Sequence, residues 1–156
     1  MAFYIKKGNK YLKLLVQRVS RASVKIDGKE ISKIKNGFLV FIGITHSDTK
    51  EIADYLVKKL LGLRLFEDEN SKLNLSLKDV RGELLLVSQF TLYADCSKGN
   101  RPSFIKAAGG DLAKELYDYF VGECKKLLPV VKEGVFGSNM EIELINYGPA
   151  TVIMEK

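Results

Sequence analysis

The amino-acid sequence predicts an α+β fold in which a curved, mostly antiparallel, barrel-like β-sheet carries two main helices. Three observations support this prediction. Eight or so short runs are apolar or alternate apolar with polar residues, as β-strands do. Only two segments place apolar residues at helical spacing. The strands gather in groups, and strict β-α-β alternation is absent, which argues against a Rossmann fold.

The first 45 residues predict a meander of three or four strands. The candidate strands are Leu12–Val19, Val24–Ile26, Glu30–Lys35 and Phe38–Ile44. Asp27-Gly28, between the second and third, is a hairpin signal. The fourth run is almost continuously apolar and predicts a buried strand, in which Gly43 marks a bulge or a close approach of another segment.

Two helices are predicted from spacing and from their ends. Asp48 and Glu51 resemble a capping box that starts the first helix, which ends near Gly62. Its apolar stripe is Ile52, Ala53, Leu56, Val57, Leu60 and Leu61. The second helix runs from Asp111 to about Leu127, and Pro129 stops it. Its expected inward residues are Leu112, Leu116, Tyr119, Phe120 and Leu127.

The remaining strands are predicted after the first helix. Short strands are expected at Leu63–Phe66 and around Leu73, Leu75 and Leu77, and a central strand at Leu84–Leu92. The last three are Val130–Val135, Met140–Ile145 and Thr151–Met154. Gly148-Pro149 then reads as a turn between the final two.

Length and composition predict one soluble domain. The chain has 156 residues, of which 46% are hydrophobic, so residues 1–156 are expected to form a single domain with residues 1–13 as an N-terminal extension. No apolar run reaches membrane-spanning length and no signal peptide is evident, so a cytoplasmic location is expected. The net charge of +6 favours polyanions only weakly, because the basic residues are spread along the chain.

Familiar catalytic machinery is missing from the sequence. His46 is the only histidine, no Gly-x-Ser-x-Gly elbow is present, and Cys96 and Cys124 fit no metal or redox spacing. No metal site and no cofactor are therefore predicted. Cys124 is expected in the core, Cys96 as a free surface thiol, and His46 as a solvated turn residue.

Two short motifs carry the remaining chemistry. Ser88-Gln89-Phe90-Thr91 follows an apolar run, and its polar groups form either a strand end or the floor of a pocket. Thr91 has no evident general base, and an unassisted hydroxyl is a weak nucleophile. Gly148-Pro149 is either an ordinary turn or a functional one, since glycine before proline relieves the clash with the proline ring.

Taken together, these motifs resemble the signature of the D-aminoacyl-tRNA deacylases. The resemblance extends from about Leu14 to the C-terminus. Matching segments are Val16 to Val24, Gly43 to His46, Arg64 to Asp68, Leu73 to Ser76, Val87 to Asp95, Lys98 to Phe104, Phe136-Gly137 and Asn146-x-Gly148-Pro149-x-Thr151. Tyr147 departs from the family pattern, in which an acidic residue is common at that position.

The resemblance implies a homodimer that acts on tRNA, with active sites at the subunit interface. Gly148-Pro149 of one subunit would be cis and would enter the partner's pocket, where the turn excludes L side chains. Arg18 would hold this loop, and Asn146 and Thr151 belong to the same chiral-selection motif. Glycine has no side chain to exclude, so glycyl-tRNA is a possible substrate.

The resemblance also implies the chemistry. Phe136 and Met140 would lie near the 3′-terminal adenosine. Ester hydrolysis would be assisted by the RNA 2′-hydroxyl, with backbone amides near Phe90 and Thr91 stabilising the oxyanion. Ser88, Gln89, Phe90 and Thr91 would form the catalytic pocket mainly through their backbone. Two alternatives stay open: a hydrolase with Thr91 as nucleophile, and a non-catalytic nucleic-acid-binding protein that keeps the fold.

Overall fold

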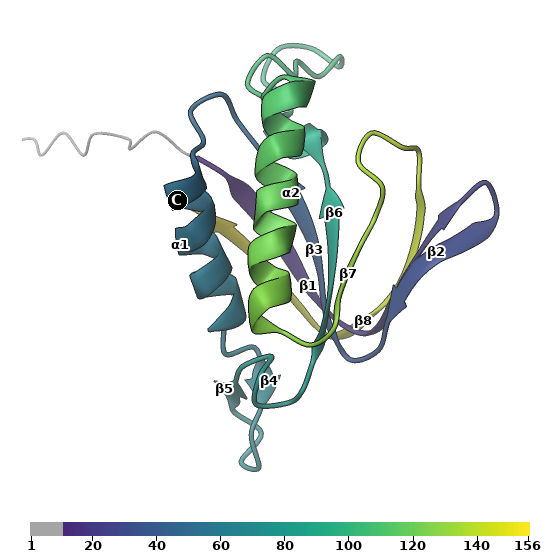
Figure 1. Cartoon of the computed structure of the whole chain (residues 1–156), viewed down its shortest axis with the longest axis vertical. Helices are drawn as coiled ribbons and strands as arrows, with labels where there is room; N and C mark the ends of the chain where they lie inside the picture. Colours follow the sequence, from purple (N-terminus) through teal and green to yellow (C-terminus); the bar gives the residue numbers. More distant parts are fainter. Residues whose placement is uncertain (1–10) are drawn as a thin grey trace, which may run out of the picture.

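The computed structural model describes residues 11–156 as two helices packed on one face of a six-stranded mixed sheet (Figure 1). The strand order is β2-β1-β3-β6-β7, with β8 paired to the other edge of β1. The sheet strands are β1 (Lys13–Ile26), β2 (Lys29–Ile34), β3 (Gly37–Gly43), β6 (Glu83–Ser88), β7 (Val131–Glu133) and β8 (Glu141–Glu155). The predicted α+β class, with two helices on a curved sheet, is confirmed.

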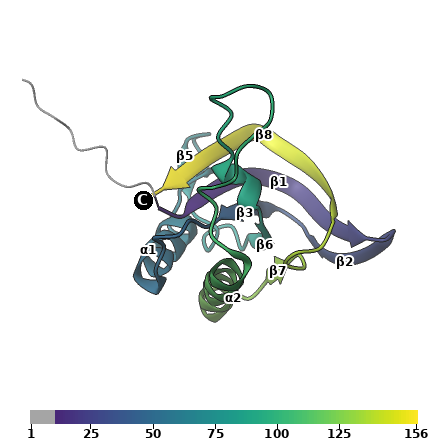
Figure 2. The ribbon, with the colours of Figure 1, turned by 90° about the horizontal axis from the view of Figure 1, so that it is seen from above.

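The pairing of the strands is antiparallel around β1 and parallel on the far side of β3. β1 pairs antiparallel with β2, β3 and β8, whereas β3–β6 and β6–β7 are parallel. The predicted meander is therefore wrong in its order, because β3 returns to pair with β1 and not with β2. Seen from above, β1 and β8 arch over the layer that faces the helices (Figure 2).

β1 is one strand where two were predicted. The polar pair Ser20-Arg21 is exposed yet stays within the strand, because the register against β8 shifts at this point and the strand bends. The hairpin that follows β1 is confirmed, since Asp27 and Gly28 have φ of 50° and 77°. The two positive φ values are those of a type I′ turn.

The N-terminal part of the chain enters the fold at Tyr11. The Tyr11 amide donates a hydrogen bond to the Lys156 carbonyl at 2.7 Å, and Leu12 is fully buried. Residues 11–13 of the predicted extension are thus part of the folded structure. Residues 1–10 of that extension lie outside the described residues.

The first helix, α1 (Lys50–Leu61), begins one residue later than the sequence pattern indicates. Its N-cap is Thr49, whose side chain accepts a hydrogen bond from Ile52. Asp48 was the expected cap, but it is buried and its carboxylate accepts hydrogen bonds from the amides of Leu12 and Thr45, both at 2.7 Å. Asp48 therefore joins the start of β1 to the loop after β3.

The second helix, α2 (Gly110–Leu127), is confirmed, and Pro129 follows its end. Leu127 was expected to face inward but is 49% exposed, whereas the next residue, Leu128, is buried in its place. Tyr119 is half-buried and donates its hydroxyl hydrogen bond to Asp54 of α1 at 2.6 Å. Both helices cover the same face of the sheet (Figures 1 and 2).

The two short strands between α1 and β6 form a separate hairpin. β4 (Phe66–Glu67) and β5 (Leu73–Leu75) pair with each other and with no strand of the large sheet. β4 starts later than the predicted Leu63–Phe66. This hairpin projects at the end of the molecule opposite the loop before α2 (Figure 1).

The predicted strand at Leu84–Leu92 ends early, at Ser88. A 3₁₀ helix, η1 (Phe90–Tyr93), replaces its second half. Gly43 explains the change, since a Cβ there would lie 3.0 Å from the Leu92 Cβ and 3.2 Å from the Tyr93 ring. Gly43 is therefore a point of close approach, and no bulge occurs in β3, whose register against β1 is unbroken.

The last two predicted strands are one long strand, β8. Gly148-Pro149 is not a turn between separate strands but part of an outward excursion within β8. The predicted strand at Val130–Val135 shortens to β7. The apolar core divides into a cluster between the sheet and the helices and a smaller one between the arched part of the sheet and β6, around Leu85 and Val87.

Candidate active site

A cavity of about 500 Å³ lies at the C-terminal ends of the parallel strands β3 and β6. Its other walls are the start of α2 and the segment between β7 and β8. It is lined by Ile42, Ile44, Val87, Ser88, Gln89, Phe90, Ala108, Gly110, Ala113, Phe136, Gly137, Ser138, Asn139, Met140 and Ile142. Ligands of open sheets with parallel strands bind at this end.

None of the residues that line the cavity has an ionisable side chain. Its polar groups are the side chains of Ser88, Gln89, Ser138 and Asn139, together with the backbone. In the described part of the chain, the cavity lining therefore contains no Asp, Glu, His, Lys or Cys that could act as an acid, a base or a nucleophile. Among the described residues, the cavity lining supplies only backbone dipoles and neutral side chains.

Phe136 and Met140 stand at one wall of the cavity, on either side of a tight turn. Gly137, between them, has φ of 78°, a conformation that favours glycine. The Phe136 ring lies 5.8 Å from the Tyr117 ring, centroid to centroid. Tyr117 is fixed in turn by its hydroxyl, which donates to the Leu86 carbonyl at 3.0 Å, and burial raises its pKa. An aromatic face is thus held firmly beside the end of β6.

Two backbone amides just after the end of β6 have no hydrogen-bond partner within the described part of the chain. The Gln89 amide donates to the Ile42 carbonyl at 2.8 Å, and the chain then turns into η1. Phe90 and Thr91 are the first residues of this helix, whose opening amides have no partner within it. Among the hydrogen bonds of residues 11–156, the amides of Phe90 and Thr91 donate none. Two such donors form a site suited to an anion or a developing oxyanion.

The Thr91 hydroxyl is engaged by a neighbour. Gln89 donates a side-chain hydrogen bond from its amide nitrogen to Thr91 Oγ1. Thr91 is exposed and, unlike Ser88, Gln89 and Phe90, does not line the cavity. No basic group contacts this hydroxyl within the described part of the chain, so a base that would activate it is not in place.

The loop around Gly148 is built against a buried arginine. Asn146 pairs with Val19 and Thr151 with Gln17, so four residues of β8 lie opposite the single residue Arg18. This excursion comprises residues 147–150. Its Gly148–Pro149 peptide bond is cis, as the resemblance implied, and Gly148 has φ of 120°.

Arg18 contacts the excursion directly. Its Nε donates to the Tyr147 carbonyl at 2.9 Å, and its Nη1 donates to the Leu65 carbonyl at 2.8 Å. The guanidinium carbon lies 5.0 Å from the centroid of the Tyr147 ring, and Arg18 is only 3% exposed. A Cβ on Gly148 would come within 2.5 Å of Arg18 Nη2. The departure from the family pattern at Tyr147 therefore adds an aromatic surface over the arginine.

The two motifs do not meet within one chain. Gly148 of β8 lies opposite Arg18 of β1. Arg18 pairs in turn with Phe38 of β3, and Phe38 pairs with Leu84 of β6. Going from Gly148 to Ser88 therefore crosses three strand spacings, from β8 to β6, and then follows β6 for four residues, from Leu84 to Ser88. At about 4.8 Å per strand and 3.3 Å per residue, the separation along the sheet is roughly 20 Å. Of the predicted site residues, the structure gathers Ser88, Gln89 and Phe90 with Phe136 and Met140, and leaves Arg18, Asn146, Gly148, Pro149 and Thr151 together elsewhere.

Other reactive residues lie outside the cavity. His46 is exposed as predicted, and its Nε2 lies 2.7 Å from the Ile105 carbonyl. Cys96 is exposed and Cys124 is buried, both free, and burial raises the pKa of the Cys124 thiol to about 12. Within residues 11–156 no cluster of three or more His, Cys, Asp or Glu could hold a metal ion. None of the helices in that part of the chain combines the length and the apolar character that a membrane crossing requires.

Several cavity residues were not predicted from the sequence. Gly110 and Ala113 come from the first turn of α2, and Ser138 and Asn139 from the turn after Phe136. Small residues at a helix start and polar residues in a turn have ordinary structural explanations. The only available signal was Phe136-Gly137, which the resemblance had already singled out.

Comparisons with known sequences place the chain among similar proteins over nearly its whole length. The sequence model of the family described as D-Tyr-tRNA(Tyr) deacylase matches residues 15–155. A protein of Clostridium novyi named D-aminoacyl-tRNA deacylase is 54% identical over 144 residues, covering 92% of this chain and 97% of the relative. A protein of Thermosipho africanus with the same name is 49% identical over the same shares.

Comparisons with solved structures agree on the fold. The structure titled "c-Myc DNA Unwinding Element Binding Protein" superposes with a TM-score of 0.88 at 40% identity, covering 92% of this chain and 98% of that one. A structure described as a probable eukaryotic D-amino acid tRNA deacylase superposes with a TM-score of 0.81 at 18% identity, covering 93% and 99%. The second likeness concerns the fold alone.

Proposed function

The chain belongs to the D-Tyr-tRNA(Tyr) deacylase family, and from this premise we propose that it hydrolyses the ester bond of D-aminoacyl-tRNA to release the D-amino acid and free tRNA. The observation that carries the proposal is a cavity without ionisable side chains, lined in part by Phe90, whose amide and that of the adjoining Thr91 have no hydrogen-bond partner among the described residues. An aminoacyl ester needs little more than this, because water is the attacking group, the ribose oxygen is the leaving group, and the neighbouring RNA hydroxyl can assist the proton transfer.

The hydrolysis follows from the groups at the floor of the cavity. A water molecule attacks the ester carbonyl carbon, and the carbonyl oxygen becomes an oxyanion. The amides of Phe90 and Thr91 donate to that oxyanion and stabilise the tetrahedral intermediate. The terminal 2′-hydroxyl of the RNA assists proton transfer to the departing ribose oxygen, since no side chain of the cavity wall can supply the proton.

Phe136 and Met140 provide the wall for the terminal adenosine. Stacking of a base on an aromatic face stabilises binding by about 1–3 kcal/mol. The Phe136 ring is held against Tyr117, so little side-chain freedom is lost when a base stacks on it.

Chiral selection is assigned to the excursion of β8. Gly148 and Pro149, flanked by Asn146 and Thr151, are exposed at a place roughly 20 Å from their own cavity. We assign them to the cavity of a second copy, in a homodimer in which each site takes its floor from one subunit and its excluding wall from the other. A rigid wall that occupies the position of an L side chain leaves room for any D side chain and for glycine, so glycyl-tRNA is an expected second substrate.

The activity is tested by comparing matched substrates. We expect release of D-tyrosine from D-tyrosyl-tRNA(Tyr) and no release of L-tyrosine from the L form. Replacing the terminal 2′-hydroxyl with hydrogen should slow release strongly. Equal rates on both enantiomers would contradict the chiral assignment, and a normal rate on the 2′-deoxy substrate would remove the role of the RNA hydroxyl.

The shared site is tested by mixing two defective subunits. Gly148→Ala alters the excluding wall, and Ser138→Trp fills the cavity from its turn. If sites are shared, a heterodimer of the two variants retains one intact site of two. Equal mixing should then restore about a quarter of the wild-type activity, because about half of the dimers are hybrids. No recovery would show that each subunit carries its own complete site.

A second candidate function follows from one comparison. The relative that is 40% identical and superposes with a TM-score of 0.88 is named for binding a DNA unwinding element. A nucleic-acid-binding protein without catalysis would bind RNA or DNA but leave D-aminoacyl-tRNA intact. The deacylation assay above separates the two functions.

We place the chain in the cytoplasm, where aminoacyl-tRNA is used, as one domain that needs no cofactor.

A further inference from the structure

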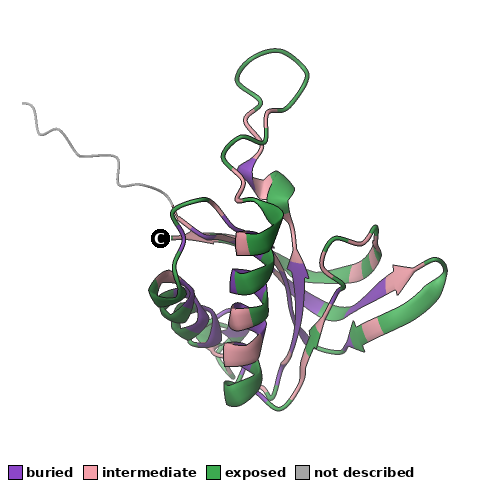
Figure 3. Ribbon diagram, turned by 45° about the horizontal axis from the view of Figure 1, so that its top comes forward, coloured by how far each residue is buried: buried purple, intermediate pink, exposed green. Residues whose placement is uncertain are grey.

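A projecting loop beside the cavity carries positive charge that the fold does not use. We define the basic loop as residues 96–102, which lie between Asp95 and Ser103. These two residues close the loop with paired backbone hydrogen bonds of 2.8 and 2.9 Å. All seven loop residues are exposed, and the loop stands clear of the molecule above the start of α2 (Figure 3).

The base of the basic loop is tied to the cavity. Phe104, just after the loop, packs edge-on against Phe90 of the cavity floor at a ring distance of 5.2 Å. The chain then runs to Ala108, which lines the cavity and donates its amide to the Ile44 carbonyl at 2.9 Å. The base of the loop is therefore fixed relative to the cavity.

Two of the basic side chains near the tip have no partner. Lys106, at the base, lies 3.7 Å from the Asp95 carboxylate. Hydrogen bonds from Ser97 lower the pKa of Asp95, so this carboxylate stays ionised and offsets the lysine. Lys98 and Arg101 have no hydrogen bond, ion pair or ring contact among the described residues.

The composition of the basic loop fits a phosphate backbone better than a protein surface. It contains no carboxylate and no aromatic or large aliphatic side chain, whereas protein interfaces are centred on such apolar groups. Lysine and arginine on a polar, exposed loop are the groups that contact phosphates. Seven residues closed at their base can reach about 10 Å outward, at about 3.3 Å per residue along each arm.

We propose that Lys98 and Arg101 bind the phosphates of the acceptor strand of the tRNA as it leaves the cavity. This inference rests on the proposed function, which places the 3′-terminal nucleotide in the cavity. The nucleotides before it have to continue out of the cavity mouth, past Phe90 and Phe104 and along the basic loop. The loop acts through charge and is indifferent to base sequence.

The test compares a long and a short substrate. The double variant Lys98→Glu/Arg101→Glu is assayed on D-tyrosyl-tRNA(Tyr) and on 3′-O-D-tyrosyl-adenosine, which has no phosphate backbone. We expect KM for the tRNA to rise about tenfold or more at 0.1 M salt with kcat retained, and both constants for the adenosine ester to stay unchanged. For the double variant, the slope of log affinity for tRNA against log salt concentration should become less steep by about 0.7 for each phosphate that the loop no longer binds.

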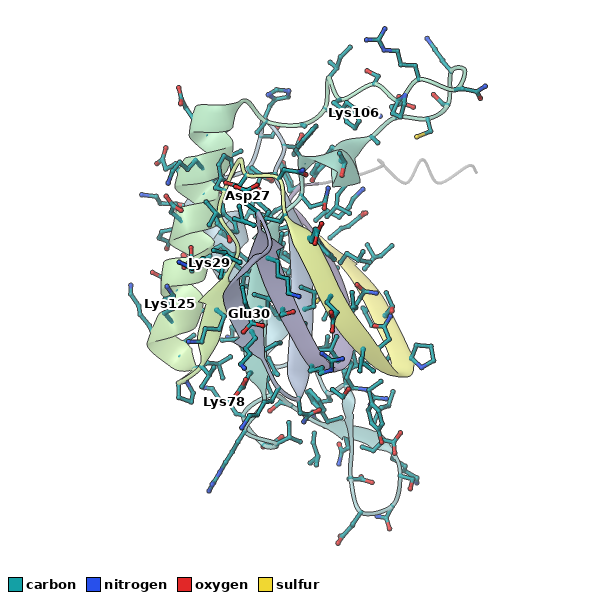
Figure 4. All side chains as sticks on the ribbon, turned by 90° about the vertical axis from the view of Figure 1, so that its right-hand side faces the viewer. Asp27, Lys29, Glu30, Lys78, Lys106 and Lys125 are labelled. Carbon is teal, nitrogen blue, oxygen red and sulfur yellow. The ribbon has the colours of Figure 1, made fainter. Side chains whose placement is uncertain are left out.

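The matched control reverses two charges at the far end of the molecule. Lys72 and Lys78 are exposed beside the β4–β5 hairpin, and Lys78 lies opposite Lys106 along the molecule (Figure 4). Lys72→Glu/Lys78→Glu changes the net charge equally and should leave KM for tRNA unchanged. If the control raises KM as much as the loop variant, the effect is one of net charge and the proposal is wrong.

Two further outcomes overturn the proposal, and one separates it from the proposed function. An unchanged KM for tRNA shows that the loop does not contact RNA. An equal loss on both substrates shows that the substitutions disturb the cavity. If the wild type hydrolyses neither substrate, the proposed function fails. Binding of an acceptor-stem minihelix that carries no amino acid then tests the loop alone. We expect a larger Kd for the loop variant and an unchanged Kd for the control variant.

Discussion

Replacing Arg18 with lysine tests whether the geometry of the buried guanidinium, and not its charge, holds the Gly148 excursion. Lysine keeps the charge and much of the aliphatic stem, but it has one nitrogen where arginine uses two. Arg18 donates from Nε to the Tyr147 carbonyl and from Nη1 to the Leu65 carbonyl. A single ammonium can satisfy one of these carbonyls at best.

The expected loss of stability is about 2–3 kcal/mol. A hydrogen bond from a charged donor contributes about 1.5–3 kcal/mol, and a buried acceptor left unsatisfied costs about 1–3 kcal/mol. Arg18 is only 3% exposed and Leu65 7%, so solvent does not replace the lost donor. The loss is measured by urea unfolding at one fixed protein concentration, because association of the proposed dimer would shift the apparent stability.

Arg21→Lys is the matched control. Arg21 lies three residues further along β1 and donates to Glu143 at 2.7 Å, but both side chains are more than half exposed. Exposed ion pairs contribute little, so we expect a change below about 0.5 kcal/mol. Equal, small losses for both variants would refute the idea that the fork of the Arg18 guanidinium matters.

The same variant should affect activity. If the 2–3 kcal/mol is lost from holding the excursion in its active position, kcat/KM on D-tyrosyl-tRNA falls by about 30- to 150-fold. Arg21→Lys should leave it unchanged. A destabilised Arg18→Lys protein with full activity and unchanged rejection of L-tyrosyl-tRNA would separate the arginine from chiral selection.

Three further predictions concern the excursion, the cavity floor and the thiols. Gly148→Ala should lower stability and activity, because its Cβ would lie 2.5 Å from Arg18 Nη2 at a φ of 120°; wild-type behaviour in unfolding and deacylation assays would contradict the observed packing. Thr91→Ala should keep turnover within about tenfold, because the Thr91 amide and not its hydroxyl serves the oxyanion; complete loss with intact tRNA binding would favour the nucleophile mechanism. Ellman's reagent at pH 8 should find one reactive thiol in the native protein, Cys96, and two in urea, because the pKa of Cys124 is about 12 and deprotonation has to await unfolding. Two fast-reacting thiols in the native protein would show that the helix core opens readily.

The elements were predictable where local patterns and packing agree. The apolar stripe of α1 and the Asp27-Gly28 hairpin gave correct elements, because helical spacing and positive φ are local properties. Asp48 was misassigned as a cap because its partner, the Leu12 amide, is 36 residues away in sequence. The end of β6 was misplaced for a similar reason: the packing of Tyr93 against Gly43 is a tertiary contact without a local signal.

The sequence singled out residues that line the cavity, but it did not give the distance between the two motifs. The motif around Ser88 and that around Gly148 were both identified, yet only the strand register shows that they lie roughly 20 Å apart in one chain. Residue spacing along a sequence carries no information about which strands separate two segments. Small cavity residues such as Gly110 were missed because their contribution is the space that they leave.

A site whose proposed hydrogen-bond donors are backbone amides is hard to identify from side-chain patterns alone. The proposed oxyanion donors are backbone amides, and any residue other than proline at positions 90 and 91 would supply them provided that the chain turns into η1 there. The turn depends on Gly43, which allows Leu92 and Tyr93 to pack at 3.0–3.2 Å from its missing Cβ. A residue larger than glycine at position 43 should therefore displace η1 and misalign the oxyanion donors without touching the substrate. In the proposed mechanism, catalysis depends on backbone position, and the side chains that control that position belong to the packing of the fold.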